Sequence, residues 1–143
     1  MTLMKGIITA LVGILTVMVA SADTVSDLRP VIKEAAVQNG IDPVLMEAII
    51  RLESGHATSN AARTKNNLAG IMGRKSLRSY ASKEDCIRHL GSILAKYKAR
   101  GRVTVAQISR TYSQARGVWA IRVTNCMGQI RNGRWGDIGV YNN

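Results

Sequence analysis

The sequence predicts a mainly α-helical domain, and three observations support this prediction. Apolar residues recur at helical spacing in several segments, residues typical of helix ends lie between those segments, and 46% of the 143 residues are hydrophobic, which is enough for a packed core. The length allows one domain at most. The apolar fraction excludes a disordered chain, and the 13 glycines and 2 prolines exclude collagen-like or low-complexity sequence.

The first 22 residues have the features of a secretory signal peptide. Lys5 precedes an uncharged apolar run over residues 6–19, and the triplet Ala-Ser-Ala at residues 20–22 supplies a cleavage site. This run is shorter than the ~20 residues that span a bilayer, which favours cleavage over an uncleaved anchor. We therefore expect residues 23–143 to be the mature protein, located in the periplasm, in the cell wall or outside the cell.

Two helices are expected over residues 25–38 and 43–54. Asn39-Gly40 is a typical stop for the first helix, and Asp42-Pro43 places a capping residue and a first-turn proline at the start of the second. The apolar positions at helical spacing are Val25, Leu28, Val31, Ile32 and Ala35 in the first helix, and Val44, Leu45, Ala48, Ile49 and Leu52 in the second.

The periodicity fades over residues 55–81, which predicts a long functional loop with at most a short β-hairpin. Ser82 and Asp85 then form a capping box that opens a helix ending near Gly101. The apolar positions of this helix are Ile87, Leu90, Ile93, Leu94 and Tyr97.

Two further helices and a tail complete the mature chain. Thr104 is expected to cap a short helix that carries Val105, Ile108 and Tyr112, and a last helix should run from about residue 118 to 130. Trp119, Val123 and Met127 lie on one face of that last helix. Residues 132–143 are rich in Gly and Asn, which predicts a loose tail.

The chain is strongly basic, with 20 Lys and Arg against 9 Asp and Glu and a net charge of +11. Charge of this sign attracts polyanions, and the export signal directs the expectation to anionic polymers of the wall or envelope. An exported DNA-binding protein would rest on charge alone. Aromatic residues make up 4% of the chain, with no Phe, which argues against a stacking platform for single strands. We therefore expect no nucleic-acid partner.

The two cysteines, Cys86 and Cys126, are too few for a disulfide scaffold or a zinc site. In an oxidising compartment they could form one bridge, which would stabilise the fold by ~3 to 4 kcal/mol. The alternative is two buried thiols that act as small apolar residues. His56 and His89 are far apart in sequence, so we expect neither a metal nor a cofactor.

Glu53 is the strongest candidate for chemistry. At 100° per residue it shares one side of its helix with Met46, Ile49 and Ile50, so a carboxylate ends an apolar face. Burial among apolar neighbours and the negative end of the helix dipole both raise the pKa of such a carboxyl, as a general acid requires. The alternative is that Glu53 caps a neighbouring backbone group or pairs with a nearby arginine, Arg51 or Arg63.

A second acid is not evident near Glu53. Residues 54–83 contain six Lys or Arg and no Asp or Glu. Glu47 should point away from Glu53, about 240° round the helix. Glu84 and Asp85, at the start of the next helix, remain candidates.

Several short motifs, taken in order, resemble those of a known enzyme family. The bacterial glucosaminidases, which are the autolysin-type family 73 glycoside hydrolases, are similar over roughly residues 30–131. The resemblance implies a lysozyme-like helical domain within residues 23–131, which cleaves the β-1,4 bond after N-acetylglucosamine in peptidoglycan with Glu53 as the catalytic acid. The motifs are residues 47–56 (EAIIRLESGH), 66–71 (NNLAGI), 80–82 (YAS) with 86–94, and 108–112 followed by Trp119.

The same resemblance implies a set of substrate-binding residues. Asn66 and Asn67 fit turn formers that orient the cleft wall, and Gly70 would let the backbone approach a sugar. Tyr112 could hydrogen-bond to Glu53 or to the substrate, with core packing as the alternative. Trp119 and His89 are expected in the core. The whole expected set is Ser54, His56, Asn66, Asn67, Leu68, Gly70, Ile71, Tyr80 and Tyr112.

One departure from the family affects the mechanism. Only eight residues separate Ile71 from Tyr80, whereas family members commonly carry a longer segment with further acidic residues. Activation of water would then need a distant acid, a tyrosine or the acetamido group of the substrate. A lytic transglycosylase, which uses one acid, is the second interpretation, and residues 70–73 partly match its usual Gly-Leu-Met-Gln. A non-catalytic wall-binding module is the third, and in each case a monomer that binds peptidoglycan strands is expected.

Overall fold

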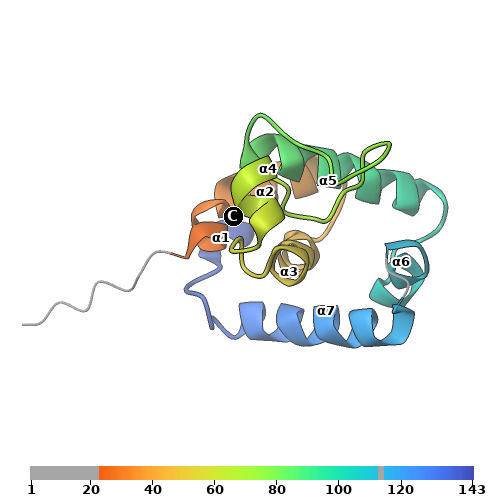
Figure 1. The fold of residues 1–143 in the computed structure, drawn as a ribbon. Coiled ribbons are helices and arrows are strands. Elements are labelled where there is room, and N and C mark those ends of the chain that lie inside the picture. The colour runs from red at the N-terminus through yellow and green to blue at the C-terminus, as the bar shows by residue number, and fades with distance from the viewer. Residues whose placement is uncertain (1–22, 113–114) are drawn as a thin grey trace, which may run out of the picture.

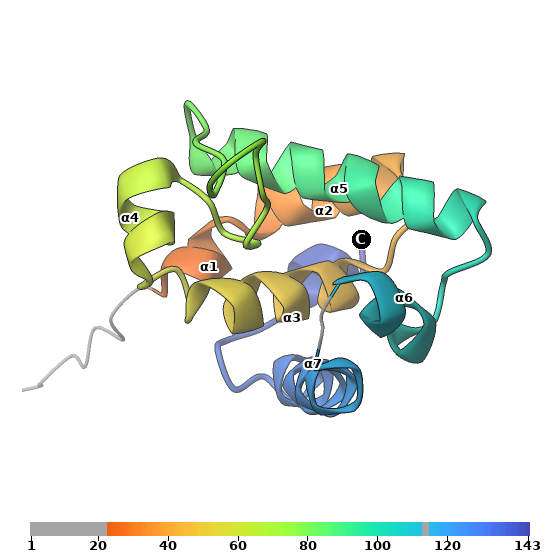
Figure 2. The ribbon, with the colours of Figure 1, turned by 45° about the vertical axis from the view of Figure 1, so that its right-hand side comes forward.

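A computed structural model describes residues 23–112 and 115–143, so the expected signal peptide lies outside the described residues. Helix α3 lies at the centre, with α2 and α5 on one side of it and α7 on the other, and α6 packs against α7 (Figures 1 and 2). The predicted mainly α-helical class is confirmed. The helices are α1 (Thr24–Asp27), α2 (Arg29–Gln38), α3 (Pro43–Ser54), α4 (Asn60–Lys65), α5 (Lys83–Ala99), α6 (Val105–Tyr112), α7 (Arg116–Arg131) and the 3-10 helix η1 (Gly139–Tyr141).

The central helix α3 has the predicted bounds because local signals define both of its ends. The Asp42 side chain accepts a hydrogen bond from the Val44 N–H at 2.9 Å, Pro43 occupies the first turn, and Gly55 ends the helix at φ +55°. Met46 and Ile50 are fully buried. Elements pack on several sides of α3, and it therefore forms the core of the domain.

The first expected helix, over residues 25–38, is divided into α1 and α2 at Leu28. Pro30 explains the break, because proline has no N–H to donate and its ring collides with the carbonyl four residues earlier. Pro30 instead occupies the first turn of α2, where a proline is tolerated.

The long loop expected over residues 55–81 contains one helix that the sequence analysis missed. Helix α4 begins after Ser59, whose hydroxyl accepts from the Ala62 N–H at 3.1 Å. The short hairpin that the prediction allowed is reduced to one isolated antiparallel bridge, between Met72 and Leu77. The rest of the segment is loop, as predicted.

Where the prediction gave a bound for α5, α6 or α7, the observed bound lies within two residues of it. Ser82 caps α5 by accepting from the Asp85 N–H at 3.1 Å, and Thr104 does the same for the Gln107 N–H at the start of α6. Helix α7 begins at residue 116 and buries Trp119 and Val123. No helix in the part of the chain that the structure describes is long and apolar enough to cross a membrane.

The expectation of a loose tail over residues 132–143 is wrong. The Trp135 carbonyl accepts from the Ser26 hydroxyl at 2.9 Å and from Arg29, and the Tyr141 hydroxyl donates to Glu47 at 2.6 Å. The prediction relied on the Gly and Asn content and gave no weight to Trp135 and Tyr141, which attach this C-terminal segment to the buried charged residues of α2 and α3.

Of the two alternatives left open for Cys86 and Cys126, the structure has the second: no disulfide joins them, and both are buried free thiols. Cys86 lies on α5, where its sulfur faces the Leu68 N–H at 3.2 Å, and Cys126 lies on α7. Helices α5 and α7 flank α3 on opposite sides, which explains why the two thiols do not meet (Figure 2). Burial raises the pKa of both thiols.

Candidate active site

Glu53 lies in the last turn of α3 and lines a pocket of about 240 Å³ between α3 and α7, which we call the Glu53 pocket. It forms no ion pair with Arg51 or Arg63; Arg51 instead pairs with Glu47 and Asp23. The alternative interpretation of Glu53 as an ion-pair partner of a nearby arginine is therefore wrong. The pocket is lined by Leu52, Glu53, Ala115, Val118, Trp119 and Arg122.

The indole of Trp119 fixes one oxygen of Glu53. Its Nε1–H donates to Glu53 Oε1 at 2.6 Å. Trp119 is 5% exposed, so it is a core residue as expected, but its N–H also reaches the candidate acid. The ring stacks on Tyr112, with centroids 5.2 Å apart and an interplanar angle of 27°, and this contact holds the indole in place.

Burial raises the pKa of Glu53 above its usual value, because the charged form loses water contacts inside the fold. The hydrogen bond from Trp119 favours the ionised form and opposes part of this rise. The net result is a carboxyl that stays protonated at higher pH than a free glutamate.

Gly70 faces the second oxygen of Glu53. Its backbone has φ +63°, and a Cβ at this position would lie 3.4 Å from Glu53 Oε2. Glycine adopts this left-handed conformation without strain and leaves the space beside Oε2 open. The two carboxyl oxygens thus differ: Oε1 is bound by an indole, and Oε2 faces a bare backbone.

A second pocket, of about 300 Å³, has Gly70 in its lining, and we call it the Tyr112 pocket. The Tyr112 hydroxyl donates to the Ala69 carbonyl at 2.6 Å, so in this arrangement it bonds to the loop rather than to Glu53. Burial raises the pKa of Tyr112 well above its usual value. The pocket is lined by Ala69, Gly70, Ile71, Met72, Ile93, Tyr97, Thr111 and Tyr112.

The loop that carries Gly70 is shaped by Asn67, which is buried. Its amide donates to the carbonyls of Ile71 and Arg78 at 2.8 and 2.9 Å, and its Oδ1 accepts from the Ile71 N–H at 3.1 Å. Asn66 ends α4 at φ +52°, and Leu68 is fully buried. Asn66, Asn67 and Leu68 therefore support the cleft wall instead of lining either pocket.

Three further residues of the expected set line neither the Glu53 pocket nor the Tyr112 pocket. The Ser54 hydroxyl is buried and accepts from the Ala57 N–H, so it stabilises the turn after α3. His56 contacts Arg51 and Trp135. The Tyr80 hydroxyl contacts His89 Nδ1 at 2.6 Å, and burial raises the pKa of Tyr80 to about 12.

No second carboxylate lines the Glu53 pocket or the Tyr112 pocket, and all nine Asp and Glu belong to the described part of the chain. Asp85 pairs with Arg88 at the start of α5, and Glu84 lines neither pocket. Glu47 points away from Glu53, as expected. Within residues 23–112 and 115–143, no three His, Cys, Asp or Glu gather as metal ligands.

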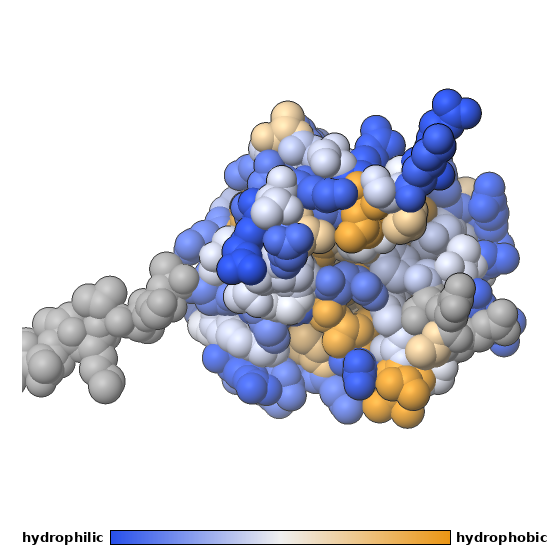
Figure 3. Space-filling view, viewed as in Figure 1, coloured by the Kyte–Doolittle hydropathy of each residue, from blue (hydrophilic) through white to orange (hydrophobic). Residues whose placement is uncertain are grey.

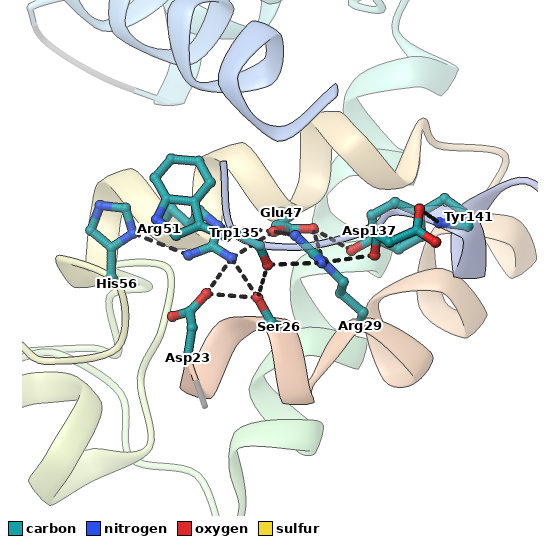
Figure 4. A network of polar contacts seen from close by, with 10 residues as sticks. Asp23, Ser26, Arg29, Glu47, Arg51, His56, Trp135, Asp137 and Tyr141 are labelled. Atoms are coloured by element: carbon teal, nitrogen blue, oxygen red, sulfur yellow. Dashed lines mark hydrogen bonds and ion pairs between the residues drawn. The ribbon is translucent and has the colours of Figure 1, made fainter. Parts of the chain in front are cut away.

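Glu47 is instead the centre of a buried polar cluster that sequence reasoning missed (Figure 4). Arg29 forms two hydrogen bonds with its carboxylate, both at 3.0 Å, and Arg51 donates to it from one turn further along α3. The Tyr141 hydroxyl completes the cluster. Glu47 and Arg51, four residues apart on a helix, were the one local signal of this arrangement.

The surface around the site is mixed in character. Figure 3 shows separate apolar patches among hydrophilic residues, one of them over the end of α7 where that helix begins. Val118 and Ile121 are exposed apolar residues of that part of α7.

One protein-family model matches the part of the chain that contains the candidate active site. The family model described as "Glucosaminidase: Mannosyl-glycoprotein endo-beta-N-acetylglucosaminidase" matches residues 29–131, which include Glu53, Gly70, Tyr112 and Trp119. Comparison with curated proteins and with solved structures gave no match.

Proposed function

Because this chain belongs to the glucosaminidase family and is therefore a glycoside hydrolase, we propose that it cleaves peptidoglycan with Glu53 as the general acid. One observation carries the proposal: a carboxyl whose pKa is raised by burial lies in a pocket, with one oxygen bound by Trp119 and the other facing Gly70. A glycosidic oxygen leaves poorly unless it is protonated, so this is the group that the reaction needs.

The indole N–H determines which oxygen holds the proton. In a neutral carboxyl the carbonyl oxygen is the stronger hydrogen-bond acceptor, so we assign Oε1, which accepts from the Trp119 N–H, as the carbonyl oxygen and Oε2 as the oxygen that carries the proton. Oε2 is the oxygen beside Gly70, where a sugar could approach the bare backbone. Glu53 therefore presents its proton toward the open side of the cleft.

The attacking group is proposed to come from the substrate. No other carboxylate lines the two pockets, and the Tyr112 hydroxyl already donates to Ala69. The 2-acetamido oxygen would attack C1 as the proton moves from Oε2 to the bridging oxygen and the C1–O bond breaks. Water would then attack C1, return a proton to Glu53 and release the acetamido group.

The bond proposed to be cut is the β-1,4 linkage after N-acetylglucosamine. A lytic transglycosylase is the second candidate, and the single carboxylate at the site favours it as well. In that reaction the 6-hydroxyl of the sugar replaces water as the attacking group. Either enzyme would act outside the cytoplasm, in agreement with the leader expected at residues 1–22.

Digestion of purified peptidoglycan, followed by mass spectrometry of the fragments, tests the proposal. A glucosaminidase leaves reducing N-acetylglucosamine ends, whereas a transglycosylase leaves 1,6-anhydro-muramic acid. Glu53→Gln should lower the rate of lysis by ~10² to 10⁴. Glu34→Gln, a change at an exposed glutamate of α2, is the matched control. Equal lysis by Glu53→Gln would reject the acid role, and binding to walls without new ends would identify a non-catalytic module.

A further inference from the structure

A third pocket, of about 310 Å³, lies beside the Glu53 pocket and shares Leu52 and Arg122 with it. We call it the cationic pocket. It is bounded by α3, α7 and the C-terminal segment, and its polar lining residues are Arg51, His56, Arg122, Asn125, Gln129 and Arg134.

The residues that line this pocket include three arginines and no Asp or Glu. Arg51 is neutralised by Glu47 and Asp23, which lie outside the lining. Arg122 and Arg134 are exposed, and within the described residues neither belongs to an ion pair. Two guanidinium groups therefore remain available for an anion.

Aromatic and hydrogen-bond contacts hold Arg51, Arg134 and His56 around the pocket. Trp135 contacts two arginines, with the Arg51 guanidinium 4.1 Å and the Arg134 guanidinium 5.0 Å from the ring centroid. Arg51 donates to His56 Nδ1 at 3.2 Å, so the imidazole hydrogen lies on Nε2. Burial and the nearby Arg51 and Arg134 lower the pKa of His56, in agreement with a positive local potential.

Helix α7 connects the cationic pocket to the candidate acid. Trp119, Arg122, Cys126 and Gln129 follow one another at three- and four-residue spacing, so they form one stripe along the helix. From Trp119 to Gln129 this stripe is about 15 Å long at the helical rise per residue. Trp119 and Cys126 are buried members of this stripe, and Arg122, which is exposed, lines both pockets. A strand that places a bond at Glu53 and continues past Arg122 would bring a neighbouring sugar to the cationic pocket.

We propose that the cationic pocket binds a carboxylate of the peptide carried by the glycan strand, and so selects peptide-bearing over neutral strands. This inference rests on the proposed function, because it assumes that a glycan lies across Glu53. Guanidinium forks bind planar carboxylates with two parallel hydrogen bonds, and two such forks flank the pocket. A phosphate-rich wall polymer could bind the same arginines without reaching Glu53, and the experiment below distinguishes it from a peptide carboxylate.

Binding to the Glu53→Gln protein tests the inference without cleavage of the ligand. The probes are one peptide-bearing glycan fragment, the same fragment with its carboxyl groups amidated, and a chitin oligomer of equal length. We expect amidation to weaken binding at least tenfold, the loss typical of one charge-assisted hydrogen bond. Adding Arg134→Gln should abolish the preference for the carboxylate form, and Arg122→Gln should reduce it.

Arg100→Gln is the matched control, because it removes one positive charge at the end of α5 and lines none of the three pockets. It should keep the preference. Equal binding of the native and amidated fragments would overturn the inference, as would a preference that survives both Arg134→Gln and Arg122→Gln. Tighter binding of a poly(glycerol phosphate) at the same arginines, with no carboxylate preference, would assign the pocket to the phosphate polymer.

Hydrolysis by the wild-type protein separates this inference from the proposed function. If it cleaves native and amidated fragments at equal rates, the carboxylate site is wrong and the hydrolase stands. If it cleaves no fragment while the carboxylate preference is found, the proposed function is wrong and the anion pocket stands.

Discussion

Replacing Tyr141 by phenylalanine should lower the free energy of unfolding by about 2 kcal/mol, because it removes one hydrogen bond to a buried carboxylate. The Tyr141 hydroxyl donates to Glu47 Oε2 at 2.6 Å, and Glu47 is fully buried in α3. Phenylalanine keeps the ring, so packing of the C-terminal segment changes little. The substitution therefore isolates the contact that joins the end of the chain to the central helix.

The magnitude follows from what remains around Glu47. A hydrogen bond to a charged group contributes ~1.5 to 3 kcal/mol. Arg29 and Arg51 still hold the carboxylate, so the ~3 to 5 kcal/mol cost of leaving a buried charge unpaired does not arise. With a urea slope of ~2 kcal/mol per molar, the unfolding midpoint should fall by about 1 M.

Urea unfolding followed by far-UV circular dichroism measures this change. Tyr97→Phe is the matched control, since Tyr97 is partly buried on α5 and its hydroxyl has no hydrogen-bond partner among the described residues. The control should move the midpoint little. An unchanged midpoint in Tyr141→Phe would refute the reasoning and return residues 132–143 to the loose tail that their composition suggested.

Three further predictions concern the site itself. Trp119→Phe removes a donor that favours ionised Glu53, so the pKa of Glu53 should rise and the alkaline limb of the kcat/KM profile should move to higher pH; an unmoved limb would contradict the hydrogen bond. Gly70→Ala should cost ~1 to 2 kcal/mol of stability through its positive φ and also reduce activity, whereas Gly101→Ala, with φ +75° and open space around it, should show the stability loss alone. Burial raises the pKa of Glu53 in the folded state, so the Glu53 side chain contributes fully to stability below the unfolded pKa of 4.5, and this contribution is lost as pH rises through the folded pKa. Across this pH window, the thermal stability of Glu53→Gln should therefore increase relative to that of the wild type. A stability difference that does not change with pH would argue against burial of the charge.

Local signals made much of the fold predictable. The ends of α3 are defined by Asp42, Pro43 and Gly55, which act through contacts within a few residues or through their own backbone angles. Ser82 defines the start of α5 in the same local way. The break before α2 carried a local signal too, in Pro30, but the apolar spacing on both sides concealed it.

The site was predictable in part. The apolar side of α3 drew attention to Glu53, because periodicity shows which residues share a face, but the following loop without acidic residues and the family resemblance were needed to favour it as the acid. Its partner Trp119 lies 66 residues away, and Tyr141 lies 94 residues from Glu47. Such contacts depend on how α7 and the C-terminal segment pack against α3, and a single sequence holds no periodic signal for that packing.

The role of Glu53 as proton donor is tested most directly with two substrates that share a glycan and differ in the leaving group. One carries a sugar leaving group, and the other carries a nitrophenyl group that departs without protonation. Glu53→Gln should lower the rate on the sugar substrate by ~10² to 10⁴ and affect the nitrophenyl substrate far less. An equal loss on both substrates, or no loss on either, would contradict the assignment of Glu53 as the general acid.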